Sequence, residues 1–365
     1  MQDAVAELLQ ALESADRALL DAHVAEWRAL SLPGNVPPWT PTGISLAEGE
    51  SFSWLAAGRV VMSEEAGLWN GPTFHLWGRV GRRGPLLKGT RDTTTLTASA
   101  AGELELCVYS GEWADREGSA IAGGVAGYEI LRGGLDAVVI RWRGNAAEGV
   151  AALAAALPGA RLLAAEARRL ARPVSVPSGW EYLWFLGPGD LYEPGEVDGR
   201  PSIRATTADD VGILCTPVDV PLSPDTRLSW RWKVDALPSA RAESSLPTHD
   251  YLSIALAFDN GLDLTWYWSA ELEPETHYRC PLPSWDQREW HLVVRSGERG
   301  LGAWQQERRD VWTDYANAIG GAPPTRITGV WLIAVSIFQK GRGAAEYADI
   351  EIESRGHVTR VIAGA

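Results

Sequence analysis

The segment HDYLSIALAFDNGLDLTWYWS, residues 249–269, constrains the fold more than any other stretch of the chain. Apolar and aromatic residues run on both sides of Asn260-Gly261, the dipeptide that most strongly favours a tight reversal between two strands. A two-residue turn at this dipeptide would place Asp259 opposite Leu262 and would fix the pairing of every residue further along both strands. The segment therefore predicts an antiparallel hairpin within a β-sheet.

That register also assigns the side chains to faces, because successive residues of a strand point to opposite sides. One face would hold the apolar row from Leu252 to Phe258, with Asp250 at its end, and would form the core. The other face would place Trp266 opposite Ala255 and Trp268 opposite Ser253. Small residues beside an indole leave a hollow that suits a flat ligand such as a pyranose ring, or a second layer of core packing.

Nine residues are candidate site residues on this interpretation. The ligand-binding candidates are Tyr251, Ser253, Trp266, Trp268, Arg231 and Glu271. Arg231 lies on the opposite side of strand 226–234 from Trp230 and Trp232, where it would hold a ligand or take part in a salt bridge. If the protein is an enzyme, His249, Asp250 and Tyr267 would supply the acid–base chemistry.

Charge and cysteine content exclude several classes of protein. A net charge of −14 over 365 residues argues against binding to nucleic acid or to an anionic membrane surface. Cys107, Cys215 and Cys280 form no CxxC pair, so the sequence supports neither a zinc site nor a redox motif. We expect buried free thiols, and no cofactor on this evidence. Residues 1–30 lack the regions of a secretory signal, and no stretch approaches the ~20 apolar residues of a membrane span. We expect a cytoplasmic protein.

The chain divides into four parts by its pattern of residues. We expect an amphipathic helix and a Pro-rich linker over 1–37, a β-sandwich over 38–145, a helical connector with its linker over 146–179, and a second β-sandwich over 180–365. Residues 301–321 predict one helix within the second sandwich. The fold class is thus mainly β, with two jelly-roll-like sandwich modules. The apolar side of the N-terminal helix would pack on its own chain or form a homodimer contact.

The second module resembles the DUF3047 family of uncharacterised bacterial proteins over residues 180–353. The likeness is carried by LSWRWKVDALP, by HDYLSIALAFDN with WYWSAELEPET, by VVRSGERGLGAWQQERRDVWTDYANAIG and by YADIEI. It implies a jelly-roll-like sandwich and no known activity. Many members of the family carry an acidic segment where this chain has AVSIFQKGRG (334–343), so the resemblance implies no metal role for that segment here.

Residues 38–143 resemble the sandwich of soluble galactophilic lectins, through WTPTGISLAEGESFSWLAAGRV, HLWGRVGRRGPLLKG and AAGELELCVYSGEWADREGS. In that family a calcium ion near the last loop helps to hold the sugar, through an Asp and Asn residues. Asp115 matches the Asp, which implies calcium as the one candidate cofactor. Arg116 and Glu117 replace the Asn-rich part, and a solvated acidic turn is the alternative.

Three functions remain open from the sequence. The first is a protein that binds a glycan or another ring-shaped small molecule in a Trp-lined cleft of the second module. The second is a cofactor-independent lyase, isomerase or cyclase that acts on a hydrophobic metabolite, and the third is a structural or partner-binding protein. The first follows from the two resemblances and from the content of 18 Trp.

Overall fold

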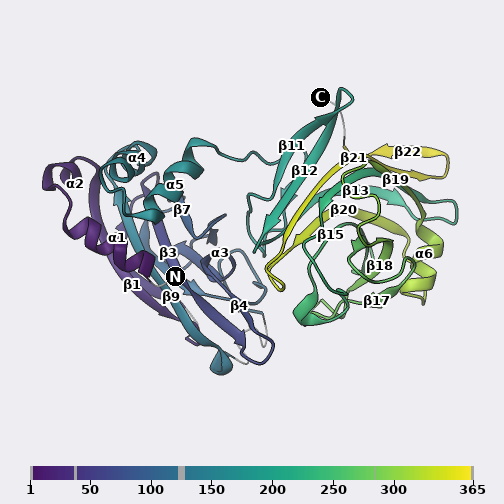
Figure 1. Ribbon diagram of the computed structural model, residues 1–365, viewed down its shortest axis with the longest axis horizontal. Helices are drawn as coiled ribbons and strands as arrows, with labels where there is room; N and C mark the ends of the chain where they lie inside the picture. Colours follow the sequence, from purple (N-terminus) through teal and green to yellow (C-terminus); the bar gives the residue numbers. More distant parts are fainter. Residues whose placement is uncertain (1–2, 37–38, 122–127, 284, 363–365) are drawn as a thin grey trace. The chain divides into compact units, whose positions relative to one another are not determined.

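The computed structural model describes residues 3–36, 39–121, 128–283 and 285–362. The chain forms two compact units: the N-terminal unit comprises Met1–Pro173 with Trp184–Gly189, and the C-terminal unit comprises Val174–Leu183 with Asp190–Ala365 (Figure 1). Both units consist mainly of β-sheet, as the sequence predicts. Residues 146–171, which the sequence assigns to a helical connector, group with the N-terminal unit.

The N-terminal unit has two sheets, whose strand orders are β1-β9-β3-β4, with β7 on β3, and β2-β8-β5-β6. Its strands are β1 (Val24–Pro33), β2 (Thr40–Leu46), β3 (Ser51–Ser63), β4 (Leu68–Asn70), β5 (Leu76–Val80), β6 (Leu87–Lys88), β7 (Thr93–Thr97), β8 (Gly102–Val108) and β9 (Arg132–Trp142). Its helices are α1 (Asp3–Glu13), α2 (Arg17–His23), α3 (Pro72–His75), η1 (Tyr128–Ile130), α4 (Ala146–Ala156) and α5 (Arg161–Ala171). Apolar residues of both sheets, among them Trp54, Leu104 and Val139, form the core between them.

Helices α1, α4 and α5 cover the outer side of the first sheet (Figure 1). Leu8 and Leu12 of α1 are buried there against Val138 and Ile140 of β9, so the apolar side that the sequence offered for a homodimer is covered by the chain itself. The N-terminal helix expected within residues 1–37 does not form as one helix. Two short helices replace it, and residues from Val24 onward form β1 because that strand pairs along β9.

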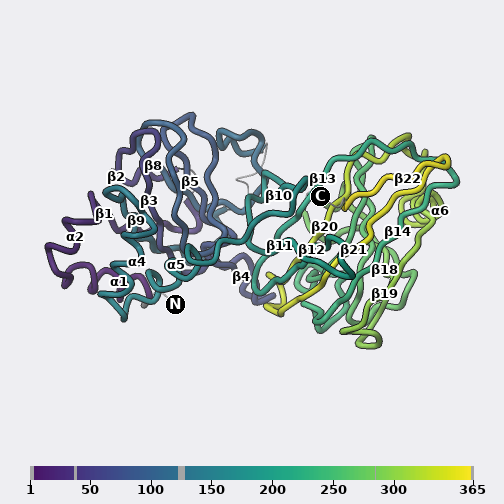
Figure 2. The backbone as a smooth tube through the Cα atoms, turned by 90° about the horizontal axis from the view of Figure 1, so that it is seen from above, coloured from purple at the N-terminus to yellow at the C-terminus, as the bar shows by residue number. Residues whose placement is uncertain are grey.

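The C-terminal unit is a sandwich of a seven-stranded sheet, β10-β13-β20-β15-β16-β18-β17, and a six-stranded sheet, β11-β12-β21-β14-β19 with β22 on β21. Figure 2 shows β11, β12, β21 and β14 following one another across the second sheet. The strands are β10 (Glu181–Tyr182), β11 (Tyr192–Val197), β12 (Arg200–Ala208), β13 (Val211–Pro221), β14 (Arg227–Ala236), β15 (Tyr251–Phe258), β16 (Asp263–Ser269), β17 (His277–Arg279), β18 (Glu289–Ser296), β19 (Gln305–Asp310), β20 (Arg326–Val335), β21 (Arg342–Ser354) and β22 (His357–Arg360), with helices η2 (Leu246–Thr248) and α6 (Val311–Ala318).

The hairpin of β15 and β16 forms, but its register differs from the prediction by one residue. Ile254 pairs with Trp266 and Ser253 with Tyr267. The loop contains three residues, since the N–H of Phe258 donates to the carbonyl of Leu262 and Gly261 adopts φ +80°. This is the three-residue hairpin loop in which the left-handed glycine forms a bulge, and it replaces the expected two-residue turn. A shift of one residue moves every side chain of a strand to the other face.

The core of the C-terminal unit consequently contains both indoles. Trp266 and Trp268 are 0% exposed and pack with Leu252, Ile254 and Leu256 between the two sheets. From the facing sheet come four residues of β14, Leu228, Trp230, Trp232 and Val234, which share one side as the alternation in TRLSWRWKV predicts.

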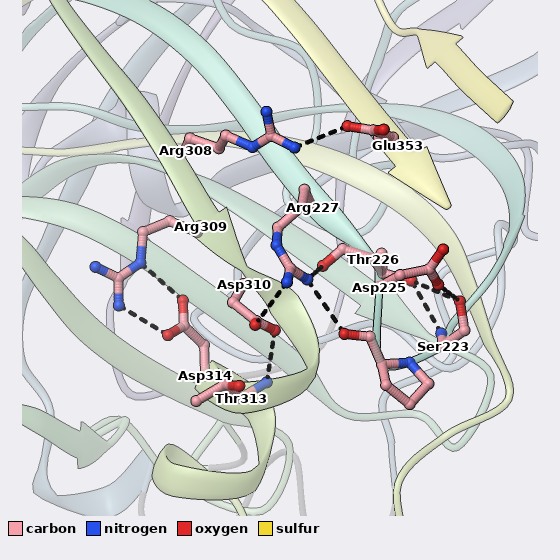
Figure 3. Close-up of polar contacts among 11 residues, drawn as sticks. Ser223, Asp225, Thr226, Arg227, Arg308, Arg309, Asp310, Thr313, Asp314 and Glu353 are labelled. Atoms are coloured by element: carbon pink, nitrogen blue, oxygen red, sulfur yellow. Dashed lines mark hydrogen bonds and ion pairs between the residues drawn. The ribbon is translucent and has the colours of Figure 1, made fainter. Parts of the chain in front are cut away.

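The segment predicted as one helix over 301–321 begins as a strand. Gln305–Asp310 forms β19 along β14, and only Val311–Ala318 is helical. Asp310 caps α6 by accepting the N–H of Thr313 at 3.0 Å, and Arg309 donates to both carboxylate oxygens of Asp314 at 2.8 and 2.7 Å (Figure 3). Helix α6 thus begins where β19 ends.

Candidate functional site

The outer face of the seven-stranded sheet, which is turned away from the six-stranded sheet, carries the chemistry of the C-terminal unit. The strand register places one row of side chains across all seven strands: Glu181, Cys215, Trp331, Ala255, Thr265, His291 and Tyr278. The adjacent row is Pro217, Gly329, Ala257, Asp263 and Glu289. Aromatic and small residues lie toward β10, and ionisable groups lie toward β17.

The part toward β10 is open to solvent. Trp331 is partly exposed, and its neighbours across the strands are Cys215, Ala255 and, one row on, Gly329 and Ala257. A Cβ at Gly329 would come within 3.3 Å of the indole Nε1 of Trp331, so the absence of a side chain there leaves room for the ring. We call Glu181, Cys215, Pro217, Ala257, Gly329 and Trp331 the open corner.

A second indole lies beside the open corner. The rings of Trp285 and Trp331 have centroids 6.5 Å apart and an interplanar angle of 80°. The guanidinium of Arg288 lies 3.9 Å from the centroid of the Trp285 ring, which is cation–π geometry. One indole therefore meets the edge of another at a partly exposed place on the sheet.

The part of the outer face toward β17 is covered by the segment before β15 and by the loop after β16. Glu243, which is 0% exposed, accepts hydrogen bonds from the hydroxyl of Ser269 at 2.5 Å and from the N–H of Ala270 at 2.7 Å. Tyr278 donates to the hydroxyl of Tyr267 at 2.9 Å. Burial raises the pKa of Glu243 above its usual value.

Four potential metal ligands lie together under this cover: His249, Cys280, Glu289 and His291, all buried, with their donor atoms within 4.8 Å of one another. We call these four residues the His–Cys–Glu group. Burial lowers the pKa of His249 to about 4 and that of His291 well below its usual value, so both imidazoles are neutral near pH 7. Burial likewise raises the pKa of Cys280 and of Glu289.

The predicted ligand shelf was wrong, because the register shift turns Trp266 and Trp268 into the core. The Nε1 of Trp266 donates to Asp314 at 2.8 Å, and that of Trp268 donates to the carbonyl of Gly297 at 2.8 Å. Tyr251 and Ser253 do lie on the outer face, but they are 3% and 0% exposed and so cannot touch a ligand from solvent.

The three residues proposed for acid–base catalysis are also buried. Asp250 accepts the N–H groups of Phe338 and Gln339 at 3.0 and 2.6 Å, an arrangement that holds the loop after β20. His249 and Tyr267 are each 0% exposed. A general base must come within hydrogen-bond reach of its substrate, and none of these three residues is reached from solvent in the structure; their catalytic role stays a prediction.

Arg231, Glu271 and Asp115 have partners of their own. Arg231 donates to Asp349 at 2.5 Å and to Asp198 at 3.2 Å on the six-stranded sheet, which is the salt-bridged alternative to ligand binding. Glu271 accepts the N–H of Ala242 at 3.0 Å.

Asp115, the residue that the lectin resemblance offers for calcium, closes its own loop. Its Oδ1 accepts the N–H groups of Glu117 and Ser119 at 3.0 and 2.9 Å, which is an Asx turn. In the described ranges, Asp115 belongs to no group of three or more His, Cys, Asp or Glu side chains suited to an ion. This geometry is that of an acidic turn, and calcium binding by Asp115 stays a prediction.

The N-terminal unit contains an open pocket of about 530 Å³, lined by Trp39, Pro41, Arg79, Gly81, Arg82, Glu103 and Glu105. Arg79 pairs with Glu105 at 2.7 Å and lies 4.3 Å from the centroid of the Trp39 ring. Trp113 stacks on Trp39 with 5.5 Å between their centroids. Arg79 and Trp113 thus already contact the ring of Trp39. The groups that the pocket has for binding a ligand are mainly charged.

Sequence reasoning missed Trp331, Trp285 and three members of the His–Cys–Glu group. The alternation in ITGVWLIAV could have placed Trp331 on the opposite side of β20 from Val330 and Leu332. Cys280, Glu289 and His291 have no spacing signal. Parallel pairing of β16 with β18 and antiparallel pairing of β17 with β18 bring them together.

Residues 178–351 match the model of the family described as "Protein of unknown function (DUF3047)". The resemblance inferred from the sequence is thereby confirmed. No curated protein sequence matches the chain. In the part that the structure describes, no helix is both long and apolar enough to cross a membrane.

Among solved structures, the N-terminal domain of EclA, a PllA-like lectin, is 18% identical, with coverage of 33% of this chain and 98% of that one and a TM-score of 0.25. The xyloglucanase domain of NopAA from Sinorhizobium fredii is 11% identical, with coverage of 52% and 98% and a TM-score of 0.30. A family 30 carbohydrate-binding module of a Clostridium thermocellum cellulase is 12% identical, with coverage of 50% and 96% and a TM-score of 0.28.

Proposed function

We propose that this protein is a carbohydrate-binding protein whose C-terminal unit holds a sugar ring on Trp331, at the open corner of the outer face. The observation that carries the proposal is a partly exposed indole on an inner strand of the sheet, flanked by small residues on the neighbouring strands. The apolar faces of a pyranose ring stack on an indole, and small neighbours leave the space that the ring needs.

Polar groups near this indole can bind sugar hydroxyls. Glu181 is exposed and lies in the same row as Trp331, with Cys215 between them. A carboxylate accepts hydrogen bonds from hydroxyl groups. Trp285 meets Trp331 edge to face, which limits the room for a ligand where the two rings meet. The combination favours a flat, hydroxyl-rich ring over a long hydrocarbon chain.

The test is to replace Trp331 and to measure binding. Purified protein is screened on a panel of immobilised glycans and soluble polysaccharides, and the best ligand is titrated by calorimetry. Because a central aromatic residue of a binding site contributes about 2 kcal/mol or more, we expect Trp331→Ala to weaken binding by about 30-fold or more. Trp331→Phe retains an aromatic face and should lose less.

Trp304→Ala is the matched control. Trp304 is also partly exposed, but Arg231 of the six-stranded sheet lies 5.3 Å from the centroid of its ring, so it is remote from the outer face. The control should bind like the unmodified protein. Equal affinity of Trp331→Ala and the unmodified protein for every ligand found would refute the assignment of the site.

The pocket of the N-terminal unit is a second candidate sugar site. Its two Arg and two Glu side chains provide donors and acceptors for hydroxyl groups, and Arg82 and Glu103 are exposed. Arg82→Ala combined with Glu103→Gln tests this pocket in the same titration. Loss of binding in this variant, with Trp331→Ala unaffected, would move the site to the N-terminal unit.

A further inference from the structure

The His–Cys–Glu group lies apart from the open corner and takes no part in the proposed sugar binding. We propose that His249, Cys280, Glu289 and His291 bind one zinc ion, which fastens the covering segments to the seven-stranded sheet. Two imidazoles, a thiolate and a carboxylate are a ligand set that suits zinc, and four protein ligands make a closed structural site.

Two of the ligand–ligand distances within the group match those of a tetrahedral ion, and all four donor atoms lie within 4.8 Å of one another. The Sγ of Cys280 lies 3.5 Å from the Nε2 of His249, and the Nε2 of His291 lies 3.4 Å from the Oε1 of Glu289. Zinc–nitrogen and zinc–oxygen distances of about 2.0–2.1 Å and a zinc–sulfur distance of about 2.3 Å imply ligand–ligand separations of about 3.3–3.6 Å in a tetrahedron. Small side-chain adjustments therefore suffice to bind the ion.

His249 is oriented as a zinc ligand. Its Nδ1 lies 2.6 Å from the backbone carbonyl of Glu243, so Nδ1 carries the proton and Nε2 presents a lone pair toward Cys280. A metal-bound imidazole commonly donates its second N–H to a carbonyl in this way. The carboxylate of Glu289 is also fixed in orientation by hydrogen bonds. Its Oε1 accepts the hydroxyls of Tyr251 at 3.3 Å and Thr265 at 3.1 Å.

His291 is the member of the group whose environment is hardest to explain without an ion. It is 0% exposed, and neither of its ring nitrogens has a hydrogen-bond partner among the described residues. Its ring stacks on Tyr278 with 5.2 Å between centroids and 7° between planes, which fixes its orientation. Burying a polar atom without a partner is costly, and coordination of one nitrogen would remove part of that cost.

The charges of the group also balance around a divalent cation. A Cys280 thiolate and a Glu289 carboxylate bring two negative charges, which a zinc ion neutralises, whereas both imidazoles stay neutral. Cys280 and Glu289 are each 2% exposed, so two bare anions at these positions would be strongly destabilised.

The proposal predicts about one zinc ion per chain in full-length protein that is expressed with zinc and purified without chelator. The zinc content is measured by inductively coupled plasma mass spectrometry. We expect Cys280→Ser and His291→Ala to lose at least about nine-tenths of the metal. Cys215→Ser and His277→Ala are the matched controls, since these residues lie in the same unit outside the group, and both should keep the metal. Trp331→Ala should keep it too, which separates this proposal from sugar binding.

A second measurement needs no variant of the group. Unmodified protein is stripped with a chelator, checked by circular dichroism for a retained fold, and titrated with cobalt(II) chloride. One equivalent should give the intense visible bands of tetrahedral cobalt and a thiolate-to-cobalt charge-transfer band, and zinc(II) chloride should displace both. Zinc-free purified protein together with no cobalt uptake by the unmodified chain would overturn the proposal.

Discussion

Replacing Trp266 by alanine tests the arrangement on which the whole site depends. In the structure this side chain lies between the two sheets of the C-terminal unit and donates to Asp314 of α6. In the register predicted from the sequence it would instead line a ligand cleft. The two arrangements make opposite predictions for the stability of the protein and for its binding of a ligand.

The expected loss of stability is large. An indole buries about 200 Å² of surface, and about 25 cal/mol per Å² gives about 5 kcal/mol as an upper value for its removal. Measured substitutions of large buried aromatic residues by alanine cost about 3–5 kcal/mol. Asp314 is not left without a donor, because Arg309 still provides two hydrogen bonds. We expect Trp266→Ala to lower the free energy of unfolding of the C-terminal unit by about 4 kcal/mol.

Urea denaturation followed by circular dichroism measures this loss. The chain has two units, so two transitions are expected, and only the one that belongs to the C-terminal unit should move. With a slope of about 2 kcal/mol per M, its midpoint should fall by about 2 M. Trp331→Ala, at a partly exposed position, should lower the midpoint much less. A midpoint for Trp266→Ala within ~0.5 M of the unmodified protein, combined with lost ligand binding, would refute the register described here.

Three further outcomes are expected. Burial raises the pKa of the Cys215 thiol to about 11, so its alkylation by iodoacetamide should accelerate about tenfold per pH unit from pH 8 to 10, and a plateau below pH 9.5 would contradict this. A sugar bound on Trp331, the neighbour of Cys215 across the strands, should slow the same alkylation. Glu166→Ala should destabilise the N-terminal unit by about 2–3 kcal/mol, measured in urea, because its buried carboxylate accepts the hydroxyls of Thr93 and Thr95; a loss below ~0.5 kcal/mol would contradict it.

The sequence predicted the elements of the C-terminal unit well where one pattern dominated. The strand around Trp230 follows from the alternation in residues 226–234, and the two strands of the hairpin follow from their apolar rows. It failed at residues 305–310, QQERRD, where charged residues on both sides of a strand give no period that favours a strand over a helix. That strand forms because it pairs with the otherwise open edge of β14, which lies about 75 residues earlier in the chain. The local sequence of 305–310 does not show this partner.

The His–Cys–Glu group shows a different limit of the sequence. Cysteine counting rejected a zinc site because it considers ligands that lie close together along the chain, whereas the ligands of this group come from four separate positions between 249 and 291. Only the crossover that pairs β16 in parallel with β18 places Glu289 and His291 beside Asp263 and Thr265. A parallel connection of this kind has no short-range signature, so no inspection of spacing would have found the group.

The register error, by contrast, could have been avoided from the sequence. The second strand of the hairpin has apolar residues at 262, 264, 266 and 268, and the first has them at 252, 254, 256 and 258. The Asn-Gly rule for a two-residue turn pairs each of these rows with the row of small or polar residues on the other strand and brings Asp263 into the core. A three-residue loop pairs the two apolar rows with each other and the two rows of small or polar residues with each other. When a local turn preference conflicts with the pattern of both strands, burial of the longer apolar rows involves far more free energy than the choice of turn, so the pattern should decide. The same pairing puts Asp263, Thr265 and Tyr267 together on the outer face, where the ionisable groups gather.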